Sequence, residues 1–175
     1  KAETLNDVEL GVEKKGSKYN VGITGYYMHY KDQLVLTGKI NDVGAYARTN
    51  IPKSNRMGVE LVGAAEPTTW FKASANFSLS RNKVIDFIEY IDDYDNGGQQ
   101  TRQYSSTDIA LSPSIVGGAT LRFIPVKKAE LSLISKYVSK QYLDNTQNER
   151  RKLNAYYTQD ARLIYSFNWK WLKEL

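Results

Sequence analysis

The densest cluster of chemically active side chains lies between residues 86 and 95. It contains five carboxylates and two phenols: Asp86, Glu89, Tyr90, Asp92, Asp93, Tyr94 and Asp95. Carboxylates accept hydrogen bonds from cationic or hydroxyl-rich ligands, and tyrosine adds flat apolar area with a polar tip. A calcium loop needs oxygen ligands at fixed spacing that end in a bidentate Glu, and this stretch lacks that Glu. We therefore interpret these residues as candidate ligand-binding residues of a mobile loop, and we assign no metal site.

Few other residues suggest catalysis. The chain has one His and no Cys, which excludes thiol chemistry, a disulfide scaffold and any multi-His metal site. His29 alternates with tyrosines, so we expect a structural or solvated role for it. No Gly-x-Ser-x-Gly element occurs. A glycosidase would need two carboxyl groups on a rigid cleft, whereas these lie in a Gly-rich segment. We expect neither enzymatic activity nor a cofactor.

The charge pattern narrows the possible partners. The formal net charge of +5 is spread along the chain, so we expect no nucleic-acid partner. Arg150, Arg151 and Lys152 form the one short basic run, which could contact anionic lipid headgroups or could simply be solvated. No run of about 18 apolar residues is present, so the sequence predicts no transmembrane helix.

The elements that would carry these residues are strands. The 175 residues fit one domain, and 13 Tyr, 3 Trp and 5 Phe with only 4 Pro favour an all-β fold. Alternating segments are predicted at about 5–14, 18–31, 56–65, 69–81, 113–125, 129–141 and 153–170. After Trp70, Phe71 and Phe77 alternate with Lys72 and Ser78. In the last segment Leu163, Tyr165, Phe167, Trp169 and Trp171 share one face. Each strand therefore has an apolar and a polar face.

The connections between these segments alternate in length. Tight turns are expected near Gly16, Pro67 and Lys127, whereas the other links span roughly 24, about 30 and about 11 residues, longer than compact domains usually use. In an up-and-down barrel every second connection lies at the same end, so short periplasmic turns would oppose long outer loops. Tyrosines and tryptophans group where strands would meet a bilayer interface: Tyr26, Tyr27, Tyr30, Tyr137, Tyr142, Tyr156, Tyr157, Trp169 and Trp171. A soluble sandwich also alternates and stays open as an alternative.

Several motifs, in order along the chain, are similar to elements of one protein family. Residues 6–13 are similar to a strand with a Glu-x-Gly element, and residues 25–34 to an aromatic strand that leads into Tyr-Lys-Asp-Gln. Residues 50–61 resemble the family's Asn, spacer and Gly-Val-Glu-Leu pattern, and residues 70–80 its strand ending in Ser-Leu-Ser. Ser112-Pro113 and the stretch 137–145, with Tyr-Val and Tyr-Leu-Asp-Asn, follow in the same order. Together these motifs resemble the β-barrel of TonB-dependent outer-membrane receptors, and the resemblance covers nearly the whole chain.

The resemblance implies an antiparallel up-and-down transmembrane β-barrel segment in the bacterial outer membrane. Residues 1–175 would be part of a barrel of about 22 strands, without plug domain or closing strands. It implies energy-coupled uptake of a scarce nutrient such as a siderophore-iron complex, cobalamin or a glycan. Implied partners are the nutrient, outer-membrane lipid with lipopolysaccharide, and the TonB complex, reached through the plug. The alternatives are a stand-alone outer-membrane barrel acting as adhesin or lipid enzyme, and a soluble β-sandwich binding module.

Overall fold

Alternating side chains and tight turns give a single-layered antiparallel sheet in the computed structural model, which describes residues 1–40 and 46–167, with side chains for 1–35 and 48–167. Its strands are β1 (Thr4–Lys15), β2 (Tyr19–Ile40), β3 (Tyr46–Ala65), β4 (Phe71–Asp92), β5 (Gln99–Asp108), β6 (Ile115–Val126), β7 (Ala129–Val138) and β10 (Tyr156–Tyr165). The short strands β8 (Gln141–Tyr142) and β9 (Lys152–Leu153) pair with each other in a separate two-stranded sheet. No helix in the described residues could cross a membrane.

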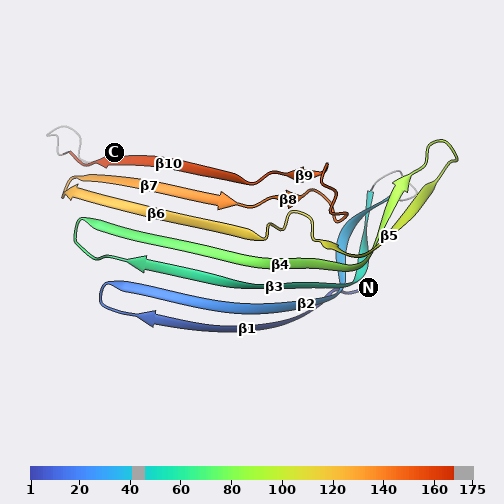
Figure 1. The fold of residues 1–175 in the computed structure, drawn as a ribbon, viewed down its shortest axis with the longest axis horizontal. Coiled ribbons are helices and arrows are strands. Elements are labelled where there is room, and N and C mark those ends of the chain that lie inside the picture. The colour runs from blue at the N-terminus through green and yellow to red at the C-terminus, as the bar shows by residue number, and fades with distance from the viewer. Residues whose placement is uncertain (41–45, 168–175) are drawn as a thin grey trace.

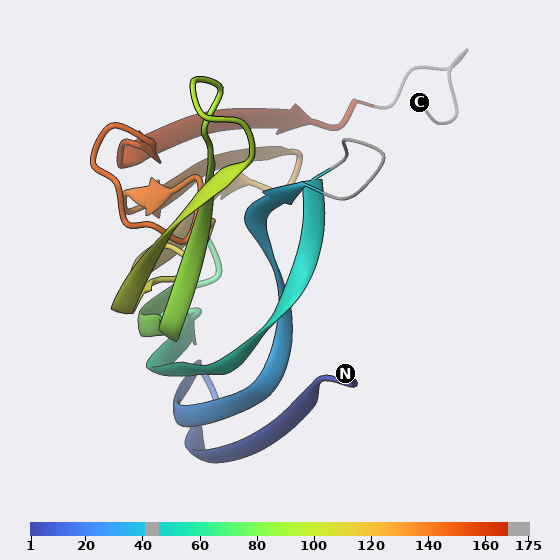
Figure 2. The same ribbon diagram turned by 90° about the vertical axis from the view of Figure 1, so that its right-hand side faces the viewer.

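The strands follow one another in the sheet as they do in the chain. The order is β1-β2-β3-β4-β6-β7-β10, every pair is antiparallel, and β5 pairs with the far end of β4 (Figure 1). Tight turns join β1 to β2, β3 to β4 and β6 to β7 at one end, as predicted, and the longer connections gather at the other. Seen along the strands, the sheet is an open, curved wall with β1 and β10 at its two ends (Figure 2). The up-and-down topology is thus confirmed.

The register confirms the predicted two faces. Val12, Ile23, Leu61, Phe77 and Gly117 are successive partners across five strands, so the apolar positions of each strand fall on one face. That face is open: Phe77 is 42% exposed and Leu163 74% exposed. A contiguous apolar face of this kind needs a covering medium.

The opposite face is polar and hollowed. Shallow hollows along the wall are lined mainly by its residues, including Thr24, Glu60, Asn76 and Lys136. Near the short turns, cations and carboxylates pair on it: Lys72 with Glu66 at 2.9 Å, Arg122 with Glu130 at 3.2 Å and Arg162 with Glu130 at 3.7 Å. This face suits an aqueous lumen.

The long connections differ from the prediction. β2 continues to Ile40 and β4 to Asp92, and β3 already begins at Tyr46, so most of the expected loops are strand. Residues 82–112, expected to be a mobile loop, consist mostly of the β4–β5 hairpin, which pairs from Lys83 to Asp108 and is closed by a turn at residues 93–98. Sequence reasoning missed these extensions because they lie beyond the apolar face, where apolar residues occur on both sides of a strand, among them Phe87 and Ile88 of β4. Backbone hydrogen bonding continues there without the alternation that reveals the wall.

Two left-handed residues mark where wall strands become outer hairpins. Asp32 in β2 and Asp86 in β4 both have a φ of 56°, and each interrupts the strand pairing at one position. Aspartate tolerates this conformation better than most residues. Beyond these points the β2–β3 and β4–β5 hairpins turn away from the plane of the wall (Figure 2).

The predicted interfacial aromatics do not all lie on one face. Tyr27, Tyr137 and Tyr157 lie on the apolar face near its border with the long connections. Tyr137 and Tyr157 are cross-strand partners on β7 and β10. Tyr26 instead lies on the polar face, where its ring covers Gly58, and a Cβ at Gly58 would lie 2.7 Å from the Tyr26 hydroxyl. Tyr142, which lies among the long connections, is only 5% exposed, so it does not belong to an aromatic belt at the membrane interface. Trp169 and Trp171 lie outside the described residues.

Candidate functional site

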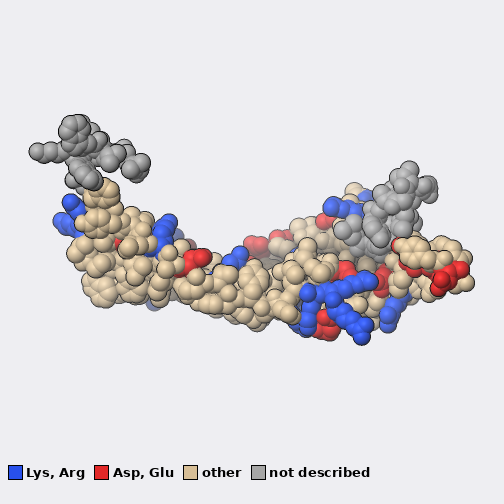
Figure 3. Space-filling model, turned by 90° about the horizontal axis from the view of Figure 1, so that it is seen from above, with Lys and Arg blue, Asp and Glu red and all other residues tan. Residues whose placement is uncertain are grey.

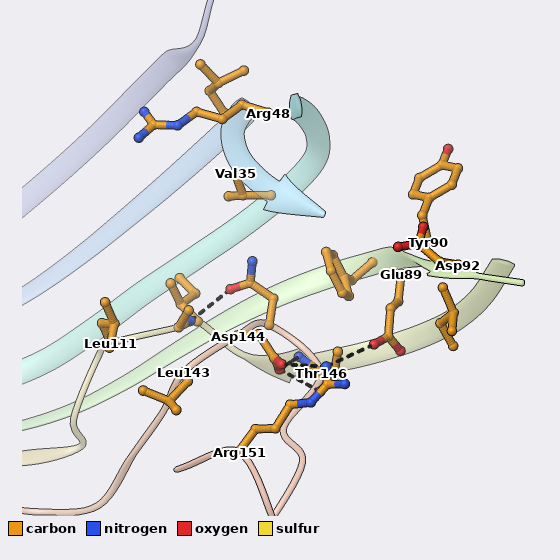
Figure 4. A pocket seen from close by; sticks show the side chains of 16 residues that line it. Val35, Arg48, Glu89, Tyr90, Asp92, Leu111, Leu143, Asp144, Thr146 and Arg151 are labelled. Carbon is orange, nitrogen blue, oxygen red and sulfur yellow. Dashed lines mark hydrogen bonds and ion pairs between the residues drawn. The ribbon is translucent and has the colours of Figure 1, made fainter. Parts of the chain in front are cut away.

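A pocket lies at the end of the sheet with the long connections. Its volume is about 640 Å³, and it is enclosed by the outer parts of β2, β3 and β4 together with the segments 109–111 and 143–151 (Figure 4). Its lining residues are Leu34, Val35, Arg48, Phe87, Glu89, Tyr90, Ile91, Asp92, Ile109, Ala110, Leu111, Leu143, Asp144, Asn145, Thr146 and Arg151. We call this the outer pocket. Its size falls in the range of small-molecule sites.

A small apolar core fixes the floor of the outer pocket. Val84, Phe87, Ile51 and Ile109 are buried against one another, with Val84 fully covered and Phe87 2% exposed. Phe87 is also the cross-strand partner of Tyr104, and their rings lie 6.1 Å apart. Burying side chains of this size favours a single conformation of the hairpin by a few kcal/mol. The hairpin is therefore a rigid wall of the pocket.

A chain of polar contacts ties the hairpin to the segment 143–151. Tyr104 donates from its hydroxyl to Glu89 Oε2 at 2.8 Å, and Arg151 Nη1 lies 3.7 Å from Glu89 Oε1. The same Arg151 nitrogen lies 3.1 Å from Asp144 Oδ2. The Glu89 side chain is only 14% exposed, and burial followed by the Glu89 hydrogen bond raises the pKa of Tyr104. Arg151 thus bridges two carboxylates from separate segments.

The segment 143–151 is also held by its own turn and by backbone contacts. Asp144 Oδ1 accepts hydrogen bonds from the backbone nitrogen of Thr146 at 2.9 Å and from its hydroxyl at 2.6 Å. The backbone nitrogen of Ala110 donates to Asn145 Oδ1 at 2.8 Å. Burial raises the pKa of Asp144, but the bonds from Thr146 and Arg151 outweigh it, and the pKa lies below its usual range. Asp144 is therefore an ionised acceptor at the pocket wall.

A second charged cluster lies beside the outer pocket, on the β8–β9 connection. Glu149 accepts hydrogen bonds from Lys152, from Tyr142 at 2.6 Å and from Lys140 at 2.9 Å, and these lower its pKa to about 2. Figure 3 shows how Lys, Arg, Asp and Glu side chains gather at this end of the molecule. The predicted basic run, Arg150–Lys152, is thus largely neutralised locally.

The structure divides the predicted binding residues into two groups. Glu89, Tyr90 and Asp92 line the outer pocket, and Asp92 accepts a 2.7 Å hydrogen bond from Gln99. The other four lie elsewhere on the hairpin: Asp86, Asp93, Tyr94 and Asp95. Asp86 is exposed at the bend, and Tyr94 is 91% exposed near the turn.

Asp93, at the start of the turn, has a structural role. Asp93 accepts hydrogen bonds from Asn96 and Gln100, which close the hairpin and lower the pKa of Asp93. No cluster of three or more metal-ligating His, Asp or Glu side chains forms within the ranges that the structure describes.

Sequence reasoning missed the pocket residues that come from distant segments. Arg48 of β3 lies across the pocket from Asp144 and Arg151 (Figure 4). Asp144, Thr146 and Leu143 follow the β7 strand, and only the Asp-Asn-Thr turn signal could have pointed to them. The outer pocket thus offers carboxylates, two guanidinium groups, a phenol and aliphatic walls, a combination suited to binding a small polar ligand with apolar parts.

A curved antiparallel meander with one apolar outer face, one polar inner face and a pocket among its long connections defines a segment of a transmembrane β-barrel. The family model for the TonB dependent receptor-like β-barrel matches residues 1–174. The chain therefore belongs to the β-barrel family of TonB-dependent outer-membrane receptors, which are transport proteins.

Solved structures with the same fold agree with this assignment. The ferric yersiniabactin uptake receptor FyuA from Yersinia pestis is 18% identical with a TM-score of 0.67, over 93% of this chain and 22% of that one. The ferric enterobactin receptor of Pseudomonas aeruginosa is 18% identical with a TM-score of 0.62, over 96% and 24%. The FrpB iron transporter from Neisseria meningitidis is 14% identical with a TM-score of 0.62, over 95% and 25%.

These likenesses concern the fold alone, and this chain spans about a quarter of the length of each structure. No curated protein matches the sequence.

Proposed function

We propose that residues 1–175 form part of the barrel domain of an outer-membrane receptor for energy-coupled uptake of a scarce nutrient. The outer pocket would be part of its ligand-binding surface. The observation that carries the proposal is that this pocket lies at the end of the wall opposite the short turns, where the long hairpins would face the outside of the cell. The plug domain and the TonB complex would supply the transport step.

The named ligands of the structural neighbours guide the choice of nutrient. They include ferric yersiniabactin, ferric enterobactin, iron and copper. Among the nutrients that the resemblance implies, a ferric siderophore is therefore the class to test first. Arg48 and Arg151 could contact acidic oxygens of such a chelate, while Tyr90 and Leu143 could pack against its apolar parts.

Two tyrosines of the same hairpin provide a matched test in the full-length receptor. Tyr90 lines the outer pocket, whereas Tyr94 is 91% exposed outside it. We expect Tyr90→Ala to weaken uptake of radioactive iron presented as ferric enterobactin or ferric yersiniabactin about tenfold, and Tyr94→Ala to leave it unchanged. Surface amounts of the folded receptor are compared by heat-modifiable mobility. Equal uptake by both variants, with either chelate, would argue against the outer pocket as the binding site.

A further inference from the structure

The turn that closes the β4–β5 hairpin contains a chemically labile pair of residues. Asn96 is followed by Gly97, and no other asparagine of the chain precedes a glycine. Both residues are exposed, and they lie beyond the last strand pair of the hairpin, Asp92 with Gln99. Asparagine is one of the thermally labile residues of proteins. Its side-chain amide can be attacked by the backbone nitrogen of the next residue, so the reactivity of the pair depends on what restrains these two groups.

The nucleophile, the backbone nitrogen of Gly97, is not restrained. In the described part of the chain, this nitrogen donates no hydrogen bond. The backbone bond that closes the turn instead joins the nitrogen of Asp93 to the carbonyl of Gly98, at 3.0 Å. A Cβ built on Gly97 would meet nothing within 4 Å, and the φ of this residue is 71°. A glycine without a ladder bond or a side chain can readily turn its nitrogen toward the preceding amide.

The electrophile, the side-chain amide of Asn96, is held by one neighbour. Its Nδ2 donates to both carboxylate oxygens of Asp93, at 3.3 and 3.1 Å, and the backbone nitrogen of Asn96 donates to Asp93 Oδ1 at 3.2 Å. Gln100 donates to the same carboxylate at 2.7 Å. Donation to a charged acceptor holds the amide in one rotamer and leaves more electron density on Nδ2, which makes it a poorer leaving group. Asp93 therefore restrains a reaction that Gly97 permits.

We propose that Asn96 is a site of spontaneous deamidation and that Asp93 limits its rate. The Gly97 nitrogen attacks Cγ of Asn96 and gives up its proton to water, which delivers a proton to Nδ2. The Cγ–Nδ2 bond then breaks, ammonia leaves, and a five-membered succinimide remains. One water molecule opens this ring at either carbonyl, which leaves isoaspartate or aspartate at position 96. The net reaction consumes water and releases ammonia. The inference depends neither on the membrane placement nor on the outer pocket and its ligand.

Deamidation would change the end of the hairpin in a defined way. The two bonds from Nδ2 to Asp93 are lost, and a new negative charge appears beside Asp92, Asp93 and Asp95. Isoaspartate also lengthens the main chain by one carbon within a tight turn. We expect the turn to open more often, whereas the apolar core around Phe87 keeps the base of the hairpin closed.

The test compares two asparagines within the full-length receptor. Asn148 is the internal control, because it is also exposed on a long connection but precedes Glu149. The purified receptor is incubated in warm neutral buffer, and isoaspartate at each position is followed over time by peptide mapping with mass spectrometry. We expect Asn96 to react at least tenfold faster than Asn148. In the aged receptor, the backbone amide of Asp93 should exchange its hydrogen at least threefold faster than in fresh receptor, and amides near Phe87 should not change.

Two matched variants test the restraint by Asp93. D93A removes the carboxylate that holds Asn96, whereas D95A removes a neighbouring exposed acid that accepts no hydrogen bond from Asn96. We expect D93A to accelerate deamidation of Asn96 at least threefold and D95A to leave the rate unchanged. Heat-modifiable mobility checks that each variant keeps its barrel.

Three results would overturn the proposal. Equal rates at Asn96 and Asn148 in the wild-type receptor would show, without any substitution, that Asn96 is not a preferred site. An unchanged or lower rate in D93A would show that Asp93 does not restrain the amide. Equal acceleration in D95A would show that the loss of any nearby acid suffices, so the contacts of Asp93 would not be the cause.

Discussion

Arg151 connects parts of the outer pocket that are far apart in the sequence. Its guanidinium group lies 3.1 Å from Asp144 and 3.7 Å from Glu89, and the Glu89 side chain is mostly covered. Arg151 itself is 58% exposed, so solvent screens both pairs and each contributes little to global stability. Its effect should be local, on how often the segment 143–151 separates from the hairpin.

Removing this guanidinium should loosen that segment without affecting the wall. We expect Arg151→Gln to make opening easier by about 0.5–1 kcal/mol, a roughly two- to fivefold increase in the cleavage rate by external protease between residues 143 and 151. Arg150→Gln is the matched control, because Arg150 makes no ion pair in the described part of the chain. Identical cleavage rates in both variants would show that Arg151 does not hold the segment.

Lowering the pH should also loosen the contact of the segment 143–151 with the hairpin. The pKa of Glu149 is lowered to about 2 by Lys152, Tyr142 and Lys140, and the pKa of Asp144 lies below its usual range. A carboxyl group with a depressed folded pKa stabilises the fold above its unfolded pKa, and this contribution is lost as the pH falls through the folded value.

The pH dependence can be read from a spin label at Asn148. Its mobility should stay constant from about pH 8 to about pH 5 and rise between about pH 4.5 and about pH 2. Glu149→Gln should make the label more mobile at neutral pH and reduce the acid-induced change. A wild-type transition centred above about pH 6 would contradict the assignment to these carboxyl groups.

At the scale of elements, the wall was predictable and the outer hairpins were not. Within the wall, apolar residues from Phe71 to Leu79 alternate with polar residues from Lys72 to Ser80, and this alternation indicated the strand β4. The alternation arises because a bilayer requires apolar side chains on one face and an aqueous lumen requires polar side chains on the other. Beyond Asp86 both faces of the hairpin contact protein or water, so apolar and polar residues no longer have to alternate. The bend itself carries no sequence period, and only the tolerance of aspartate for positive φ hinted at it.

The pocket was predictable only where its residues lie on one hairpin. Glu89, Tyr90 and Asp92 stood out as a local cluster of polar and aromatic side chains, and they do line the pocket. Arg48 and Arg151 reach it from β3 and from the β8–β9 connection. Their meeting depends on strand register and on the path of a long connection, which no local pattern encodes.

The facing of β4 can be tested by moving one charge by one residue. Phe77 lies on the apolar face and Ser78 on the polar face opposite Glu60 and Val116. In the full-length receptor, Phe77→Lys should cost about 2–4 kcal/mol near the bilayer midplane because the charge loses its hydration, whereas Ser78→Lys should be tolerated. Barrel assembly is followed by heat-modifiable mobility. Equal damage from both substitutions would mean that the assigned facing is wrong.

The whole molecule has a direction, set by short turns at one end and long hairpins at the other. If the long hairpins face the outside, labels at Asn96 and Asn148 in intact cells should react with a membrane-impermeant reagent. Labels at Gly16 and Lys127, in tight turns, should react only after the outer membrane is opened. Equal reactivity at all four positions in intact cells would contradict this orientation.

The consecutive strand order has a consequence for how the wall can be built. Most wall strands pair with the strand just before them in the sequence. The exceptions are β6, which pairs with β4 past the β4–β5 hairpin, and β10, which pairs with β7 past β8 and β9. Local pairing keeps the entropy of loop closure small, so the wall can grow strand by strand as the chain arrives. Two steps are delayed: the docking of β6, which must wait until residues 93–114 have folded back or moved aside, and the docking of β10, which must wait for residues 139–155 in the same way. Assembly machinery that holds a growing edge would therefore pause at β4 and again at β7, and the time that each outer segment needs to fold would set the length of each pause.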